Sequence, residues 1–279
     1  MIPTKQLTCG FSLPVLGFGT YLVGGHREPD STQDTHWLQI LKQVLDLGYT
    51  HLDTAESYGG WGHAEELIGR AIKHYDRKKL FLTTKVDPKH LAYDDVVQAA
   101  NQSLKRLGVK YVDLYLVHFY NSAIPLQETM RALDFLVDKG LIKHIGVSNF
   151  TTTQLQEAQQ YTKHKIVANQ LRYNLWSKEI DLDTIRYCQD HDIMVIAHKP
   201  FHRGLINEEK LKLLSALAKK YKKTEAQLVL NWLTAKKNVV TLFKSGNVQH
   251  IRENQAIFDF QLTKQEHQQF DLIVQKNQA

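Results

Sequence analysis

Cysteines and long apolar runs are scarce in this chain of 279 residues. The two cysteines, Cys9 and Cys188, lie far apart and match no metal-ligand spacing, so we expect reduced thiols without a disulfide or a zinc site. No apolar run approaches the roughly 18 residues that would cross a membrane, and the first residues lack the apolar core of a signal peptide. These absences predict a soluble cytoplasmic protein without a membrane partner.

The net charge of +6 is not gathered into a basic arm. Lysines and arginines are scattered among acidic residues, and no aromatic RNA-binding motif accompanies them. We therefore expect no nucleic-acid partner. A basic pocket for a phosphorylated cofactor remains compatible with this charge.

Three motifs of other enzyme classes are missing. The stretch Gly17-Phe18-Gly19-Thr20-Tyr21-Leu22 lacks the third glycine of a Rossmann fingerprint, and there is no P-loop. The sequence also has no His-x-His pair, which a metal-dependent barrel hydrolase would place at a strand end. We expect no metal site.

Apolar strands alternate with amphipathic helices along the chain, after an expected β-hairpin at residues 4–14. We expect strands at 16–20, 49–53, 80–85, 112–118, 142–147, 166–170, 193–197 and 239–242. The expected helices are 32–47, 63–74, 93–107, 127–138, 152–161, 181–190, 207–220, 225–235, 248–256 and 263–275. Eight such units match a closed barrel better than an open sheet. The sequence predicts one (β/α)8 TIM barrel domain over residues 1–279, with an N-terminal β-hairpin and extra C-terminal helices.

Polar residues stand at the expected strand ends, where barrel active sites lie. Such positions are partly exposed, so any one of them could be polar without a function. Asp53, Lys85 and His118 end three successive strands, and Tyr58 follows Asp53 on a glycine-rich turn. Because a phenol pKa of about 10 is high for proton donation, Lys85 would lower it and Asp53 would hold Lys85 in place. His118 could then donate a hydrogen bond to a carbonyl oxygen, and a reduced nicotinamide would supply hydride.

These residues resemble the catalytic tetrad of the aldo-keto reductases. The resemblance rests on Asp53-Thr54-Ala55, Tyr58-Gly59, Lys85 and His118, and it extends over about residues 13–260. Further matching segments are Gly146-Val147-Ser148-Asn149-Phe150, Asn169-Gln170, Tyr173-Asn174, Lys244-Ser245 and Glu253-Asn254. It implies a barrel that reduces aldehydes and ketones with NADPH, with Tyr58 as the general acid.

The resemblance also implies the binding residues. Ser148, Asn149 and Gln170 would hold the nicotinamide carboxamide, and Lys244, Ser245 and Asn254 would meet the adenosine 2′-phosphate, with Glu253 near the adenine. The full set of implied cofactor residues adds Gly19, Thr20, Asp53, His198, Lys199 and His250. Tyr21, Tyr58, Trp61, His118 and Phe119 would contact the substrate.

Two residues depart from the family pattern. His198 stands where a tyrosine usually stacks on the nicotinamide, and His250 stands where an arginine often clamps the 2′-phosphate. Neutral histidine lacks the charged bidentate fork of arginine. We therefore predict weaker discrimination of NADPH over NADH than the family norm, with possible use of NAD(H).

An open pocket is expected because the loop after His118 is short and the chain ends soon after its last helix. Small aldehydes, α-dicarbonyls or activated ketones would fit it. The main alternative is a cofactor-binding regulatory subunit on the same barrel, with little turnover. A monomer is the simplest expectation.

Overall fold

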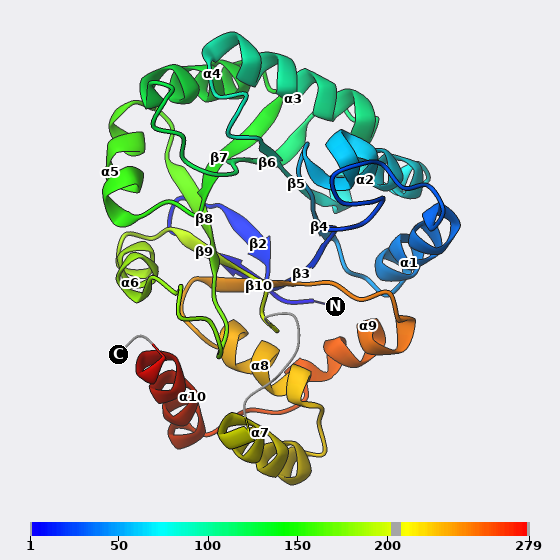
Figure 1. The fold of residues 1–279 in the computed structure, drawn as a ribbon, viewed down its shortest axis with the longest axis vertical. Coiled ribbons are helices and arrows are strands. Elements are labelled where there is room, and N and C mark those ends of the chain that lie inside the picture. Colours follow the sequence, from blue (N-terminus) through cyan, green and yellow to red (C-terminus); the bar gives the residue numbers. More distant parts are fainter. Residues whose placement is uncertain (1, 202–207, 278–279) are drawn as a thin grey trace.

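The computed structural model describes residues 2–201 and 208–277. Eight parallel strands form a closed barrel in the order β10-β3-β4-β5-β6-β7-β8-β9 (Figure 1). Their bounds are β3 Leu16–Gly19, β4 His51–Asp53, β5 Phe81–Val86, β6 Val112–Val117, β7 Ile142–Ser148, β8 Ile166–Arg172, β9 Met194–His198 and β10 Val239–Phe243. The predicted (β/α)8 barrel is confirmed.

Helices surround the barrel, as Figure 1 shows. They are α1 Asp34–Asp46, α2 Tyr58–Ile72, α3 Tyr93–Leu107, α4 Leu126–Asp138, α5 Thr152–Gln160, α6 Leu182–Asp190, α7 Glu208–Tyr221, α8 Glu225–Thr234, α9 Val248–Asn254 and α10 Lys264–Lys276. Short 3-10 helices span Arg77–Lys79 and Gln255–Phe258. The expected first residue of the 207–220 helix lies outside the described residues. Capping boxes at Thr151, Thr224 and Thr263 begin α5, α8 and α10 because each threonine satisfies an otherwise free backbone N–H.

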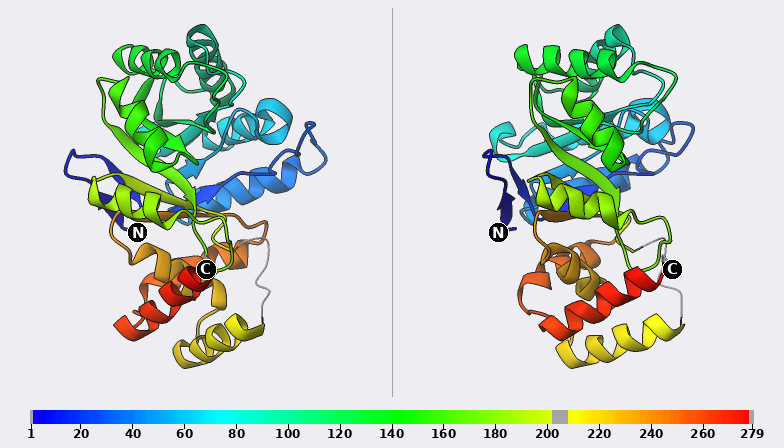
Figure 2. Two further views of the ribbon diagram at one scale, coloured as in Figure 1. Left: turned by 60° about the vertical axis from the view of Figure 1, so that its left-hand side comes forward. Right: turned by 90° about the vertical axis from the view of Figure 1, so that its left-hand side faces the viewer.

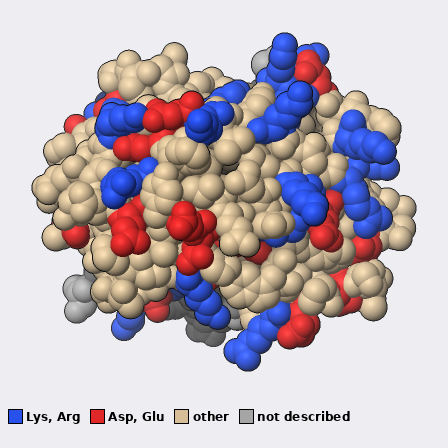
Figure 3. Space-filling view, turned by 90° about the horizontal axis from the view of Figure 1, so that it is seen from above, with Lys and Arg blue, Asp and Glu red and all other residues tan. Residues whose placement is uncertain are grey.

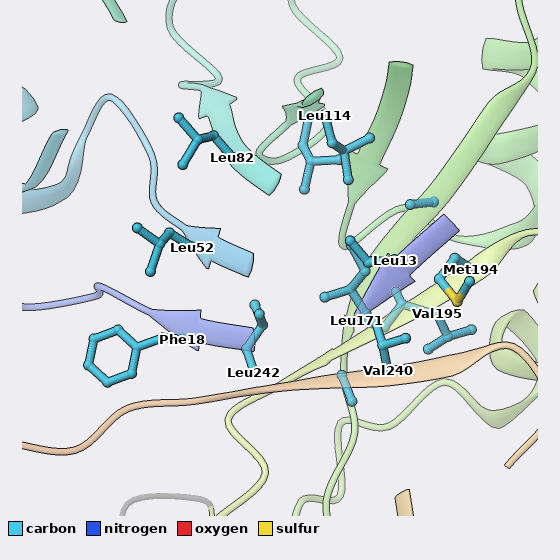
Figure 4. Close-up of a cluster of buried hydrophobic side chains, with 14 of the residues drawn as sticks. Leu13, Phe18, Leu52, Leu82, Leu114, Leu171, Met194, Val195, Val240 and Leu242 are labelled. Atoms are coloured by element: carbon cyan, nitrogen blue, oxygen red, sulfur yellow. The ribbon is translucent and has the colours of Figure 1, made fainter. Parts of the chain in front are cut away.

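The barrel strands are buried because helices cover their outer faces and side chains fill the interior. Apolar residues from successive strands meet in the cluster of Figure 4, among them Leu52, Leu82 and Leu114. Leu13 joins this cluster from the N-terminal hairpin. The core is therefore shared between the barrel and the segment that precedes it.

The N-terminal hairpin pairs β1 (Thr4–Gln6) with β2 (Ser12–Pro14) outside the barrel sheet (Figure 2). It lies at the amino-terminal ends of the barrel strands. Lys5 donates hydrogen bonds to the carbonyls of Lys236 and Val239, just before and at the start of β10. The Phe11 ring packs edge-on against Phe81 at the start of β5, with centroids 5.9 Å apart. The hairpin thus closes the end of the barrel opposite the strand exits.

The start of α2 differs from the expected helix at 63–74. Gly59, Gly60, Trp61 and Gly62 have φ values of 68°, 63°, 70° and 114°, so the chain after Tyr58 makes a left-handed turn before the regular helix begins. Glycine adopts such angles without steric cost. At Gly60 a Cβ would lie 2.2 Å from the backbone of Pro29, so the absence of a side chain lets the segment after β3 approach this turn.

The surface charge is mixed. On the face seen in Figure 3, basic and acidic side chains are interleaved. Among residues 2–201 and 208–277, no helix is both long and apolar enough to cross a membrane.

Candidate active site

A cavity of about 700 Å³ opens at the carboxyl ends of the barrel strands. Strand ends line it directly: Gly19 closes β3, Asp53 closes β4, Ser148 closes β7, His198 closes β9 and Phe243 closes β10. Because parallel strands all exit at one end, residues far apart in the sequence meet here.

Asp53 and Lys85 form a buried ion pair, of which Asp53 lines this cavity. The Lys85 Nζ atom donates to Asp53 Oδ1 at 2.7 Å and to the carbonyl of Thr54 at 2.6 Å. Burial, the largest single effect, lowers the pKa of the Lys85 ammonium, but the charges and hydrogen-bonding groups of Asp53 and Tyr58 together outweigh it, so that the pKa is raised. Burial also raises the pKa of Asp53, against the opposing effect of Lys85. Lys85 therefore stays protonated, and its position is set by two acceptors.

Tyr58 lies over this pair. The Lys85 Nζ atom is 5.0 Å from the centroid of the Tyr58 ring. Burial raises the pKa of the phenol, whereas Lys85 lowers it, and burial has the larger effect. The lysine thus acts in the expected direction, but it does not bring the pKa below the ordinary value of about 10, since desolvation penalises the phenolate. Tyr58 keeps its proton at neutral pH.

His118 stands beside Tyr58, with ring centroids 5.6 Å apart. Its backbone N–H donates to the carbonyl of Val86 at 3.0 Å, which ties the residue to the end of β5. Burial, aided by the charges of Lys85 and Lys199, lowers the pKa of His118 to about 3. The imidazole is therefore neutral through the physiological range.

Amide and hydroxyl groups form the opposite wall. Gln170 Nε2 donates to Asp53 Oδ2 at 2.8 Å, and Asn149 Nδ2 donates to Ser148 Oγ at 2.9 Å. Asn149 Oδ1 lies 3.2 Å from Nε2 of His198. Burial lowers the pKa of His198 to about 3, so this ring too is neutral. The structure thus brings together four residues that the sequence predicted for the cofactor.

Lys199 and Lys244 line the cavity farther along. The Lys244 Nζ atom donates to the carbonyl of Tyr21 at 2.8 Å and lies 4.8 Å from the centroid of the Trp37 ring. Burial lowers the pKa of Lys244. A partly desolvated ammonium that has no carboxylate among its described partners attracts an anion strongly.

Other predicted residues lie outside the cavity wall. Thr20 is fully buried, and its hydroxyl donates to the carbonyl of Asp53 at 3.0 Å. Ser245 accepts the N–H of Asn247 at 3.0 Å, and Glu253 accepts from Gln249 at 2.9 Å. The predicted residues that do not line this cavity are Thr20, Trp61, Lys85, Ser245, His250, Glu253 and Asn254.

The substrate side includes residues that the sequence reasoning did not single out. The predicted Tyr21 and Phe119 line the cavity, and with them lie Leu22, Gly25, His26, Ser57, Gly59, Pro200, Phe201 and Leu242. His26 Nε2 is 3.3 Å from the hydroxyl of Tyr21. Leu22, Gly25 and His26 could have been predicted from the sequence, because they follow the first barrel strand and barrel active sites lie at strand exits.

Comparison with known proteins agrees with this geometry. The family model for the aldo/keto reductase family matches residues 15–275. The chain is 31% identical to methylglyoxal reductase YeaE of Escherichia coli (strain K12) over 265 residues, covering 94% of this chain and 91% of that protein.

Solved structures extend the comparison. The thermostable aldo-keto reductase Tm1743, solved with the inhibitor epalrestat, superposes with a TM-score of 0.94 at 41% identity, covering 97% of this chain and 99% of that one. An aldo-keto reductase of Bombyx mori in complex with NADP gives a TM-score of 0.85 at 32% identity, covering 97% of this chain and 92% of that one. The chain therefore belongs to the aldo/keto reductase family and is an oxidoreductase.

Proposed function

We propose that this protein reduces aldehydes and ketones to alcohols with NADPH, using Tyr58 as the general acid. The observation that carries the proposal is the partly buried phenol of Tyr58, which keeps its proton and lies beside both the Lys85 ammonium and the neutral ring of His118. A proton donor and a hydrogen-bond donor beside one cavity suit a carbonyl oxygen that becomes an alkoxide.

The residues present fit a nicotinamide cofactor. Gln170 uses its Nε2 on Asp53, and its Oε1 receives no hydrogen bond from the described residues while the side chain faces the cavity. A carboxamide N–H would satisfy that oxygen. Ser148 and Asn149 lie beside it, and the cations Lys199 and Lys244 suit the phosphates. When bound, the reduced cofactor supplies the hydride.

His118 would orient the substrate. Its Nδ1 atom is buried without a partner among the described residues, which favours the tautomer with the proton on Nε2. That N–H can donate to the carbonyl oxygen. Tyr58 then gives its proton to the same oxygen as negative charge develops there, and Lys85 stabilises the phenolate left behind.

The substrate class follows from the outer walls. Phe119 and Leu22 are exposed at 47% and 40%, and they flank the cavity with the rings of Tyr21 and Phe201. Apart from Asp53, which pairs with Lys85, the described residues that line the cavity carry no carboxylate. We therefore propose small aldehydes, α-dicarbonyls or activated ketones with an apolar body.

The test is the loss of NADPH absorbance with a panel of such carbonyls, in the wild type and in Tyr58→Phe. We expect kcat/KM of the variant to fall by at least about a hundredfold, because the proton donor is gone, while NADPH still binds. Tyr120→Phe is the matched control, since Tyr120 packs on Phe150 and does not line the cavity. NADPH binding by both proteins without turnover of any carbonyl would instead favour the regulatory role.

A further inference from the structure

A second cavity, of about 250 Å³, lies between the turn after Tyr58 and the helix α3, which runs beside α2 (Figure 1). It is lined by Glu56, Trp61, His90, Asp95, Gln98, Ala99, Gln102 and Arg106. None of these residues lines the active-site cavity. It is therefore a separate space, and the proposed reduction makes no use of it.

Glu56 is the buried polar group of this cavity. Its side chain is only 6% exposed, and its Oε1 atom accepts from the N–H of Asp87 and lies 3.1 Å from Nδ1 of His90. Its Oε2 atom receives no hydrogen bond from the described residues. Burial raises the pKa of this carboxyl. A carboxylate that is buried but only half satisfied gains free energy when a positively charged donor reaches its open oxygen.

Trp61 forms an aromatic wall of the same cavity. Its side chain is 48% exposed although it is a large apolar residue, and its φ of 70° is uncommon for any residue other than glycine. The Lys89 ammonium lies 5.4 Å from its ring centroid, and the His90 ring lies 5.7 Å away. The indole therefore already accepts a cation over one face, and backbone strain of this kind persists mainly where it serves a function.

The α3 side supplies oxygen atoms. Asp95, Gln98 and Gln102 are exposed, and their spacing places them on one face of the helix. Arg106 closes the cavity, but its charge is matched by the fully buried Glu65, with Nε 2.7 Å from Glu65 Oε2. Two carboxylates, those of Glu56 and Asp95, thus face the space without a matching arginine.

We propose that this cavity binds a small organic cation of the alkylguanidinium type. A flat guanidinium can stack on the Trp61 ring while its N–H groups reach Glu56 Oε2, Asp95 and the amide oxygens of α3. An anion would meet two carboxylates. A metal ion would require several oxygen ligands at short range and would make no use of the indole.

Titration of the full-length protein with methylguanidinium tests this, followed by tryptophan emission at constant ionic strength set with potassium chloride. We expect a saturable change in the wild type. Glu56→Gln keeps a hydrogen-bond acceptor but removes the charge, so it should weaken binding about tenfold. Glu66→Gln is the matched control, because Glu66 lies on α2, bonds to His63 and does not line the cavity; its affinity should equal that of the wild type.

Asp95→Asn serves as a second variant because Asp95 is exposed and its replacement should leave the fold intact. It should weaken binding about threefold. The proposal is overturned if the emission change never saturates, if Glu56→Gln and the wild type bind equally, or if potassium or magnesium competes as well as methylguanidinium. Since binding is measured without turnover, the result is independent of the proposed reductase reaction.

Discussion

The two ends of the barrel are built in opposite ways. At the strand exits the buried groups are polar, and Asp53 bonds both to Lys85 and to Gln170. At the other end the hairpin inserts apolar side chains, and Phe11 and Leu13 are almost completely buried. Burying a polar group among apolar side chains costs free energy unless the group has a hydrogen-bond partner. A barrel end that only has to exclude water can be filled with apolar side chains instead. Under the proposed function, chemistry belongs to one end and stability to the other.

The largest expected effect comes from breaking the closed end with Phe11→Ala. Because the Phe11 ring is 2% exposed and packs on Phe81 and His144, we expect the free energy of unfolding to fall by about 3–5 kcal/mol, with kcat of the folded enzyme unchanged. Urea denaturation and the carbonyl assay measure the two quantities.

Phe119→Ala is the matched control at the mouth. Phe119 is half exposed and lines the active-site cavity. The Phe119→Ala substitution should change KM for the carbonyl substrate with little change in the free energy of unfolding. A loss of kcat in Phe11→Ala without a loss of stability would contradict the division between the ends.

A smaller effect on stability is expected inside the barrel, at His51. This side chain is fully buried; Nε2 lies 3.0 Å from Thr83 Oγ1, and Nδ1 has no partner among the described residues. Burial, with the charge of Lys85, lowers the pKa of His51 to about 3. Since the unfolded chain has a histidine pKa of about 6.5, it binds a proton that the native state refuses, and stability is lost as pH falls below 6.5.

At pH 5 this difference costs about 2 kcal/mol of stability relative to pH 7. We expect the unfolding free energy of His51→Asn to fall by about 2 kcal/mol less than that of the wild type between pH 7 and pH 5, although the variant is less stable at pH 7. Urea denaturation at both pH values measures it. Equal pH dependence in the two proteins would show that His51 is protonated in the native state.

The smallest effect concerns the cofactor, and it depends on the proposed function. His250 lies exposed on α9, where the family often has an arginine. Restoring the guanidinium in His250→Arg should raise the kcat/KM preference for NADPH over NADH about tenfold. Gln249→Arg, one position away, is the control. A wild-type preference of about a thousandfold or more would mean that another residue, such as Arg252, already holds the 2′-phosphate.

Much of this molecule was readable from local patterns. The alternation of apolar strands and amphipathic helices predicted the barrel, because each pattern depends only on neighbouring residues. The strand-end rule then predicted that Asp53, Tyr58 and His118 would meet. It did not find His26 or Phe201 on the cavity wall, because the path of a segment beyond a strand exit depends on what it packs against.

The sequence by itself determined the barrel, its family and which side chains we propose to react, since strand order places those residues at one end. Only the tertiary structure decided how they behave. Tyr58 has a raised pKa because burial outweighs Lys85, and Trp61 faces the second cavity because a left-handed turn carries it away from the first. Both outcomes depend on solvent exclusion and close contacts between distant segments, which no local pattern contains.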